Sequence, residues 1–358
     1  MNNFNEIFKD RLRRARVMRG LSMDALCELM DNQITKQTIS KYEKGKMMPG
    51  SANLILLSSA LNVSVDYFFR ENSCSIGSVE FRKKAKLGAK KIESIKEEIR
   101  DSLEKYMEIE EICNLRCHFE NPVGMIEVSE KEDVRKVVGK LKAVWNLGDD
   151  ALFSVTDLLE SHNVKVLEVN VDDDAFDGLS GYVNENLALP FVVIGKKVSV
   201  ERRRFTFLHE LGHIVMNFVT GLTQDKVERL CHFFASEMLI SSQKFLELIG
   251  QYRPYISLKE LKAIQEDYGI SMDALMYKAK ELGVVSEGRF RTFCIRRSSN
   301  HELKDWIEKS VFPDNAQPTS RFERLVYRAF ASDAISSSKA ASLLGKSIEN
   351  VNCSVNMI

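Results

Sequence analysis

A pair of histidines one helical turn apart carries the clearest chemical signal in this sequence. His209 and His213 enclose the segment HELGH, with Glu210 directly after the first histidine. Side chains four residues apart on a helix point to the same side, so both imidazoles can bind one Zn²⁺, and Glu210 can lie beside a water on that ion. Zn²⁺ lowers the pKa of such a water to about 7 and polarises a carbonyl group, while the carboxylate takes and returns the proton. The motif predicts a site for peptide hydrolysis with Glu210 as general base.

A third protein ligand must come from another part of the chain. Three of the six histidines lie within residues 209–232, and a second helix, expected over 225–240, turns back toward the first. This helix offers Glu228, His232 and Glu237. Residues nine positions apart lie on opposite sides of a helix, so Glu228 and Glu237 cannot both face the metal. The spacing alone leaves open which of the three is the third ligand.

Residues 22–46 have the layout of two short helices joined by a turn. Ser22 and Thr35 can cap the helices by accepting hydrogen bonds from free backbone N–H groups, and Gly45 suits a left-handed helix end. Four apolar side chains are expected in the shared core: Ala25, Leu29, Ile39 and Tyr42. Polar side chains are expected to point outward from the second helix: Lys36, Gln37, Thr38, Ser40 and Lys41. Such side chains read base edges or bind phosphates when a helix enters the major groove, so we expect double-stranded DNA as a partner.

Charge is balanced over the 358 residues but unevenly distributed. Lys and Arg number 51 and Asp and Glu also 51, for a net charge of 0. Residues 1–70 nevertheless have a formal net charge of +4 and residues 121–250 one of −6. The positive segment fits a phosphate-bearing partner. The two segments are therefore expected to act on different partners.

Several classes of protein are disfavoured by composition. No stretch approaches the ~20 apolar residues that span a bilayer, and the first residues lack the pattern of a signal peptide. The seven cysteines are odd in number and scattered, which indicates reduced thiols. We expect a soluble cytoplasmic protein with no membrane partner.

Hydrophobic periodicity predicts a mainly α protein with a small β-sheet, of the α+β class. Four segments are expected: an all-α helix-turn-helix domain over 1–70, a helical linker over 71–122, a metal-binding domain over 123–250 and a helical region over 251–358. Strands are expected in the third segment at 164–169, 181–183 and 191–194. A loop is expected at the acidic residues 172–177.

Residues 123–250 resemble the ImmA/IrrE family of zinc metallopeptidases, through RFTFLHELGH at 204–213 and the pattern from Glu228 to Leu239. The resemblance implies a zincin-like domain, with His209, His213 and Glu228 as Zn²⁺ ligands and Glu210 as general base. This sequence departs from the family pattern at Cys231-His232, where Ala-Asn is usual, and at Ser241, where Pro is usual.

Two further side chains are candidates for the same site. His232 could support a ligand from outside the coordination sphere or compete as a ligand itself. His232 and Tyr182 are both candidates for stabilising the oxyanion, although packing in the core is the favoured interpretation of Tyr182.

Residues 13–69 resemble the Xre-type, lambda-repressor-like helix-turn-helix family, through GLS, ISKYEKGK and VSVDYFF. The C-terminal segments 321–329 and 335–345 resemble longer ImmA/IrrE proteins that are fused to an Xre-type domain. Residues 336–351 also have the look of a DNA-binding helix pair, but they contain few cations, which favours a structural role.

The two resemblances together imply a transcriptional regulator whose zinc-dependent endopeptidase domain cleaves a specific regulatory protein, often a repressor. The alternative is a transcription factor or antitoxin-like binding protein whose metal domain senses or binds without proteolysis. A purely structural zinc is disfavoured, because structural sites are normally closed by four protein ligands. A homodimer is expected by analogy, since such DNA-binding domains usually read paired half-sites.

Overall fold

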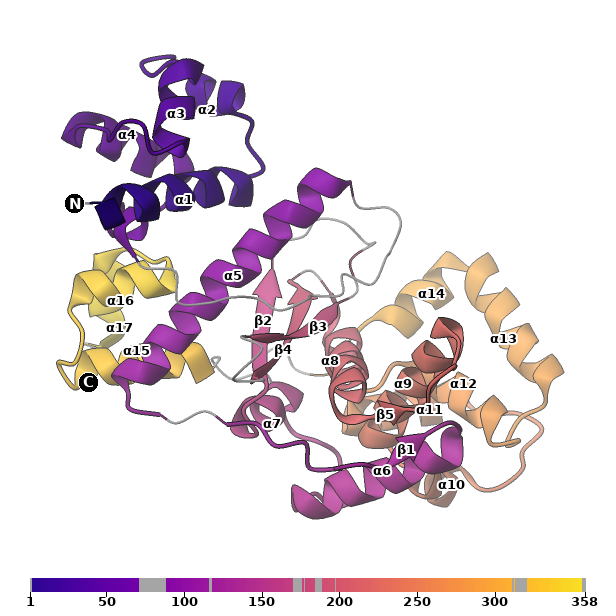
Figure 1. Cartoon of the computed structure of the whole chain (residues 1–358). Helices are drawn as coiled ribbons and strands as arrows, with labels where there is room; N and C mark the ends of the chain where they lie inside the picture. Colours follow the sequence, from indigo (N-terminus) through magenta and orange to yellow (C-terminus); the bar gives the residue numbers. More distant parts are fainter. Residues whose placement is uncertain are drawn as a thin grey trace. The chain divides into compact units, whose positions relative to one another are not determined.

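The computed structural model describes residues 2–70, 88–115, 118–169, 176, 178–183, 189–196, 198–310, 312 and 321–355. These residues form seventeen α-helices, one 3₁₀ helix and five short strands (Figure 1), which confirms the mainly α class with a small β component. The expected acidic loop at 172–177 lies almost wholly outside the described residues.

The chain divides into two compact units. The first contains residues 1–117, 182–188 and 321–358, and the second contains 118–181 and 189–320. The four segments expected from sequence thus group into two units, and the expected C-terminal region is divided between them at about residue 320.

The N-terminal part of the first unit is a helix-turn-helix domain. Its elements are α1 (Asn2–Met18), α2 (Met23–Leu29), α3 (Lys36–Glu43), α4 (Ser51–Leu61) and the 3₁₀ helix η1 (Val65–Phe69). Ser22 accepts from the backbone N–H of Ala25 at 3.0 Å, and Thr35 accepts from that of Thr38 at 3.3 Å, so both predicted caps are confirmed. Gly45 has the predicted left-handed backbone, with φ +67°. These local signals set where α2 and α3 begin and end.

One core prediction in this domain is wrong. Leu29 is 55% exposed, whereas Leu26, Cys27 and Met30 are buried. The buried side of α2 is therefore shifted by about one residue from the side that the spacing of apolar residues predicted. A helix of seven residues has too few turns for periodicity to establish which side faces the core.

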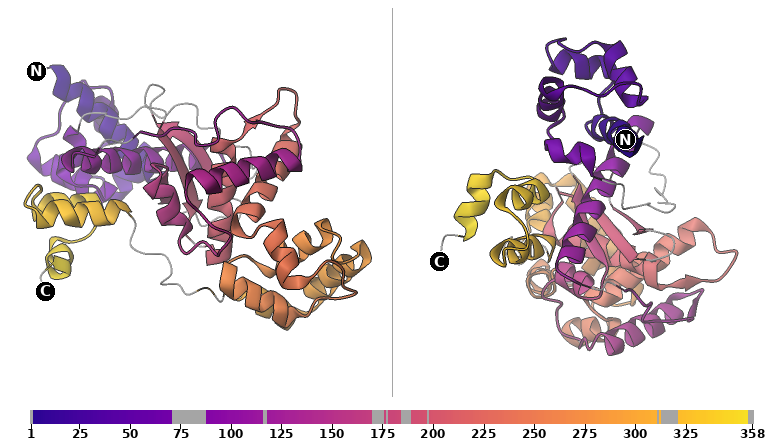
Figure 2. Two further views of the ribbon diagram at one scale, coloured as in Figure 1. Left: turned by 90° about the horizontal axis from the view of Figure 1, so that it is seen from below. Right: turned by 60° about the vertical axis from the view of Figure 1, so that its left-hand side comes forward.

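The first unit is completed by the long helix α5 (Ala89–Ile112) and three C-terminal helices, α15 (Arg321–Ala331), α16 (Ser337–Leu344) and α17 (Ile348–Val355). Two further views show the C-terminal helices beside α5 (Figure 2). Arg321 of α15 pairs with Glu110 of α5, and Lys339 of α16 pairs with Glu108 at 2.5 Å. The helix expected to be a linker is thus part of the unit that contains the helix-turn-helix domain.

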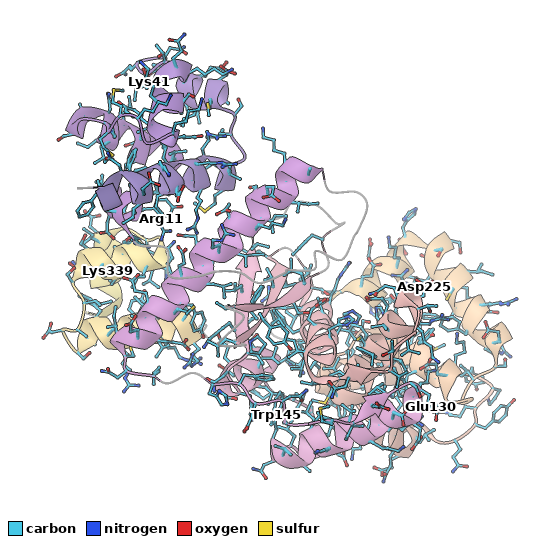
Figure 3. All side chains as sticks on the ribbon, in the orientation of Figure 1. Arg11, Lys41, Glu130, Trp145, Asp225 and Lys339 are labelled. Carbon is cyan, nitrogen blue, oxygen red and sulfur yellow. The ribbon has the colours of Figure 1, made fainter. Side chains whose placement is uncertain are left out.

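A buried ionic cluster joins α1 to α5. Arg11 donates to Glu104 Oε2 at 2.5 Å, and Arg14 donates to Glu104 Oε1 at 2.9 Å and to Glu97 at 2.8 Å. Figure 3 shows Arg11 on the side of α1 that faces α5. Arg11 and Glu104 are almost completely buried, so neither charge has water as an alternative partner.

The second unit contains the sheets, apart from the last two residues of β3, which the division assigns to the first unit. Strands β2 (Lys165–Val169), β4 (Leu189–Gly195) and β3 (Leu179–Val183) form one sheet in the order β2-β4-β3. β2 and β4 run parallel, with Lys165 opposite Phe191. A second, two-stranded sheet pairs β1 (Glu127–Val128) in parallel with β5 (Asn217–Phe218). All residues of β4 are buried, as expected of a central strand.

The described part of the second unit also contains nine helices: α6 (Lys131–Val144), α7 (Val155–Ser161), α8 (Val200–Val215), α9 (Gln224–Leu239), α10 (Ser242–Ile249), α11 (Leu258–Tyr268), α12 (Met272–Glu281), α13 (Glu287–Ser299) and α14 (His301–Glu308). α8 packs against β4 and against α9. None of the described helices is long and apolar enough to cross a membrane.

A buried arginine fixes the position of α8. Arg204 is fully buried and donates to four carbonyl oxygens, those of Leu152, Phe153, Tyr268 and Gly269, over distances of 2.6–3.3 Å. Burial lowers its pKa to about 10, which still leaves the guanidinium charged at neutral pH. Its hydrogen bonds connect α8 to the segment before α7 and to the turn after α11.

Candidate metal centre and nucleic-acid interface

Close packing of two helices brings the metal motif and the third ligand together. A Cβ atom on Gly212 would lie 3.1 Å from Phe234 Cδ1 of α9 and 3.2 Å from Met216 Cε. Both distances are shorter than ordinary van der Waals contact. The absence of a side chain at residue 212, next to His213, therefore lets α9 approach α8 closely enough for Glu228 to reach the histidines.

Three potential ligand atoms converge between α8 and α9. His209 Nε2 lies 3.1 Å from Glu228 Oε2 and 3.2 Å from His213 Nε2, and His213 Nε2 lies 3.7 Å from Glu228 Oε2. Atoms at the corners of a tetrahedron of zinc–ligand bonds are separated by about 3.3 Å. The separations therefore fit a single ion, and among the described residues this group could hold a metal ion.

The other two residues considered as third ligand are engaged elsewhere. Glu237 pairs with the buried Lys278 at 2.5 Å and accepts from the backbone N–H of Ser242 at 3.0 Å. His232 Nδ1 donates to the backbone carbonyl of Glu228 at 2.7 Å. The ring of His232 lies beside that of His209, with centroids 4.4 Å apart, which places it next to the three convergent side chains rather than among them.

The proposed general base is held by a residue that the sequence did not indicate. Ser180 of β3 donates through Oγ to Glu210 Oε2 at 2.6 Å. Nearby, a Cβ atom on Gly178 would lie 2.6 Å from Thr206 Cγ2 and 3.7 Å from Glu210 Cγ, so the chain before β3 passes close to α8. No motif links Ser180 to Glu210, because thirty residues separate them and only the sheet brings them together.

The electrostatics of the site favour a charged Glu228. The hydrogen bond with His209 and the nearby ring of His213 hold the pKa of Glu228 well below its usual range. Burial, together with the nearby His209, lowers the pKa of His232. Glu228 thus keeps the ionised form that a metal ligand needs, and His232 favours the neutral form.

Tyr182 does not pack in the core, contrary to the favoured interpretation. It lies on β3 with 41% of its surface exposed, between the buried Gly181 and Val183. Side chains alternate between the two faces of a strand, and Tyr182 is on the exposed one. Partial burial raises the pKa of its hydroxyl, which therefore stays protonated at neutral pH. A role in stabilising an oxyanion stays a prediction.

The outer side of α3 carries the predicted polar residues. Lys36, Gln37 and Lys41 are exposed and Thr38 and Ser40 are partly exposed, while Ile39 and Tyr42 are buried. Figure 3 shows Lys41 on the outer side of the helix-turn-helix domain. Lys36 forms an exposed ion pair with Asp24 at 2.7 Å. The α3 side chains are thus available to a nucleic acid, but part of the charge of Lys36 is neutralised within the protein.

The two lysines of residues 336–351 are both engaged within the first unit. Lys339 pairs with Glu108, and Lys346 pairs with Glu323. These are the only two cations in residues 336–351. Their pairing supports a structural role for this helix pair, as the sequence favoured, since a phosphate-binding helix needs unpaired cations.

Comparisons with known proteins agree with both resemblances. Residues 12–68 match the helix-turn-helix family model, and residues 159–280 match that of the IrrE N-terminal-like domain of the Peptidase M78 family. Two curated proteins named as uncharacterized HTH-type transcriptional regulators, from Sinorhizobium medicae strain WSM419 and Rhizobium meliloti strain 1021, are each 43% identical over 61 residues. These residues are 17% of this chain and 42% of each relative. The chain therefore combines a helix-turn-helix domain with an IrrE-like domain, and its match spans less than half the length of the curated relatives.

Proposed function

We propose that this protein is a DNA-binding transcriptional regulator whose second unit is a zinc-dependent endopeptidase that cleaves a specific regulatory protein, such as a repressor. The observation that carries the proposal is the convergence of His209, His213 and Glu228, with Glu210 next to the first of them. Three protein ligands leave a fourth position open, which is typical of a catalytic rather than a structural zinc site.

Each residue around the site has a different role in the proposed hydrolysis. A bound Zn²⁺ would supply Lewis acidity, which activates a water and polarises the scissile carbonyl. Glu210 accepts a proton from the attacking water and returns it to the leaving amine. The hydroxyl of Ser180 donates a hydrogen bond to Glu210 Oε2. This hydrogen bond orients the carboxylate and leaves Oε1 available to accept the proton. The lowered pKa of His232 favours its neutral form, and its side chain lies at the exposed edge of the site, where it can meet the substrate.

The identity of the third ligand can be tested by metal analysis. We expect the wild-type protein to bind about one Zn²⁺ and Glu228→Gln to lose most of it, because an amide is a much poorer ligand than a carboxylate. Glu237→Gln and His232→Ala should retain it, since neither side chain lies among the convergent atoms. Zinc per chain is measured by elemental analysis after dialysis. Loss of zinc in Glu237→Gln or His232→Ala, with retention in Glu228→Gln, would assign the ligand differently.

The α3 surface can be tested by the salt dependence of DNA binding. We expect Lys41→Ala to weaken binding to DNA from the upstream region of its own gene and to reduce the slope of log K against log salt by about 1, the effect of one lost phosphate contact. Lys36→Ala should have a smaller effect, because that lysine is paired with Asp24. Lys259→Ala, an exposed lysine of the second unit, is the matched control. Equal affinities for Lys41→Ala and this control would exclude α3 as the DNA-contacting helix.

Two further features are part of the proposal. A regulator of chromosomal DNA acts in the cytoplasm of a bacterium, which is the location we propose. Binding as a homodimer would place two α3 helices on paired half-sites.

A further inference from the structure

Cys231 contacts His213, one of the two candidate metal-binding histidines, at the ring nitrogen that faces away from the potential metal position. Its Sγ lies 3.1 Å from His213 Nδ1, on the side of the imidazole opposite to Nε2, and its side chain is completely buried. Cys231 is on α9, three residues after Glu228. One turn of this helix therefore carries the potential ligand Glu228 and also the residue that contacts the potential ligand His213. Cys231 itself is not among the side chains that converge on the potential metal position.

The direction of this hydrogen bond determines what His213 can do. A neutral imidazole carries its proton on one nitrogen only, and a metal binds the nitrogen without it. When His213 Nδ1–H donates to the sulfur, the lone pair of Nε2 points toward His209 and Glu228. The opposite tautomer would place a hydrogen on Nε2, directed at His209 Nε2 only 3.2 Å away, and would prevent metal binding.

The two histidines differ in this respect. His209 Nδ1 is buried and has no hydrogen-bond partner within the described part of the chain. Metal-binding histidines almost always donate their second N–H to a fixed acceptor, and loss of that acceptor typically costs 10–100-fold in metal affinity. Of the two histidines, His213 is therefore the one whose Nδ1 has a buried side-chain partner that can fix its orientation.

We propose that Cys231 is a positioning residue that holds His213 in the tautomer and orientation needed to bind the metal. The proposal rests on the zinc site of the proposed function. It also gives a physical role to one of the positions at which this sequence departs from the family pattern.

Zinc affinity, measured by competition with a chromophoric chelator on the full-length protein, tests the proposal. We expect Cys231→Ala to raise the Kd for Zn²⁺ by about 10–100-fold and Cys231→Ser to restore most of the affinity. Alanine and serine are similar in size but only serine provides an acceptor, so a mere packing role predicts equal affinities for these two variants. Cys27→Ala, which removes a buried thiol from the helix-turn-helix core, is the matched control and should bind zinc like the wild type.

The possible failures can be told apart. A wild-type protein that binds no zinc overturns both the zinc site and the role of Cys231. A wild-type protein that binds zinc, with a Cys231→Ala variant of equal affinity, overturns the role of Cys231 alone. Replacement of zinc by Co²⁺ adds a spectroscopic test: a sulfur-to-cobalt charge-transfer band in the near ultraviolet, absent from Cys231→Ser, would make Cys231 a direct ligand and would also overturn the proposal.

Discussion

Glu210→Gln is expected to slow cleavage of the protein substrate by about 10²–10⁴-fold, the usual contribution of a general base, while zinc content stays at the wild-type value. The amide keeps the shape of the side chain and can still accept from the Ser180 hydroxyl, but it cannot take up a proton at neutral pH. None of the three convergent ligand atoms belongs to Glu210, so metal binding should persist. Cleavage is measured by co-expression with a small repressor encoded by a neighbouring gene, followed by mass spectrometry of the fragments.

Glu302→Gln is the matched control for this experiment. Glu302 is an exposed glutamate in the first turn of α14, within the same unit but outside the site. A Glu210→Gln variant that cleaves as fast as this control would exclude Glu210 as the base. Operator binding without cleavage of any candidate by the wild type would instead favour the binding-protein alternative.

Glu104→Ala is expected to destabilise the first unit by about 3–5 kcal/mol, because it leaves buried arginine charge without its partner. Glu104 accepts from both Arg11 and Arg14, and Arg11 is almost fully buried. Burial by itself lowers the pKa of Arg14, but its hydrogen bond with Glu104 and the nearby carboxylates outweigh that effect and raise it. The pairing with Glu104 therefore stabilises the charge inside the protein.

Unfolding in urea can assign this effect to one unit. Both tryptophans of the chain, Trp145 and Trp306, belong to the second unit, so their fluorescence reports on that unit, whereas circular dichroism reports on all helices. We expect Glu104→Ala to shift a circular dichroism transition to lower urea without shifting the fluorescence transition. Glu111→Ala, an exposed position on the same helix, should change stability by no more than about 0.5 kcal/mol. Equal transitions for the two variants would contradict a stabilising role of the cluster.

Local patterns predicted much of this protein correctly. The two helix caps at Ser22 and Thr35 lie within three residues of the N–H groups that they satisfy, so the sequence was sufficient to locate them. The spacing of His209 and His213 likewise predicted a shared side of one helix. Periodicity failed at Leu29, where the helix was too short for the buried side to be identified.

The identity of the third ligand could not be predicted from local spacing alone. Spacing left Glu228, His232 and Glu237 open, and only the family resemblance favoured Glu228. In the folded chain, Lys278 engages Glu237 from 41 residues away, and this leaves Glu228 as the carboxylate beside the histidines. No pattern within α9 could reveal that, because the partner belongs to α12.

The proposed chemistry of this protein could be predicted from residue types and short spacings, since the geometry of one helical turn does not depend on the rest of the fold. The contacts that hold the site and the first unit in place were determined by tertiary structure. Ser180 reaches Glu210 across 30 residues, Cys231 reaches His213 across 18, and Arg11 reaches Glu104 across 93. Each of these contacts depends on how strands and helices that are distant along the chain pack together, and packing of that kind leaves no periodic trace in the sequence.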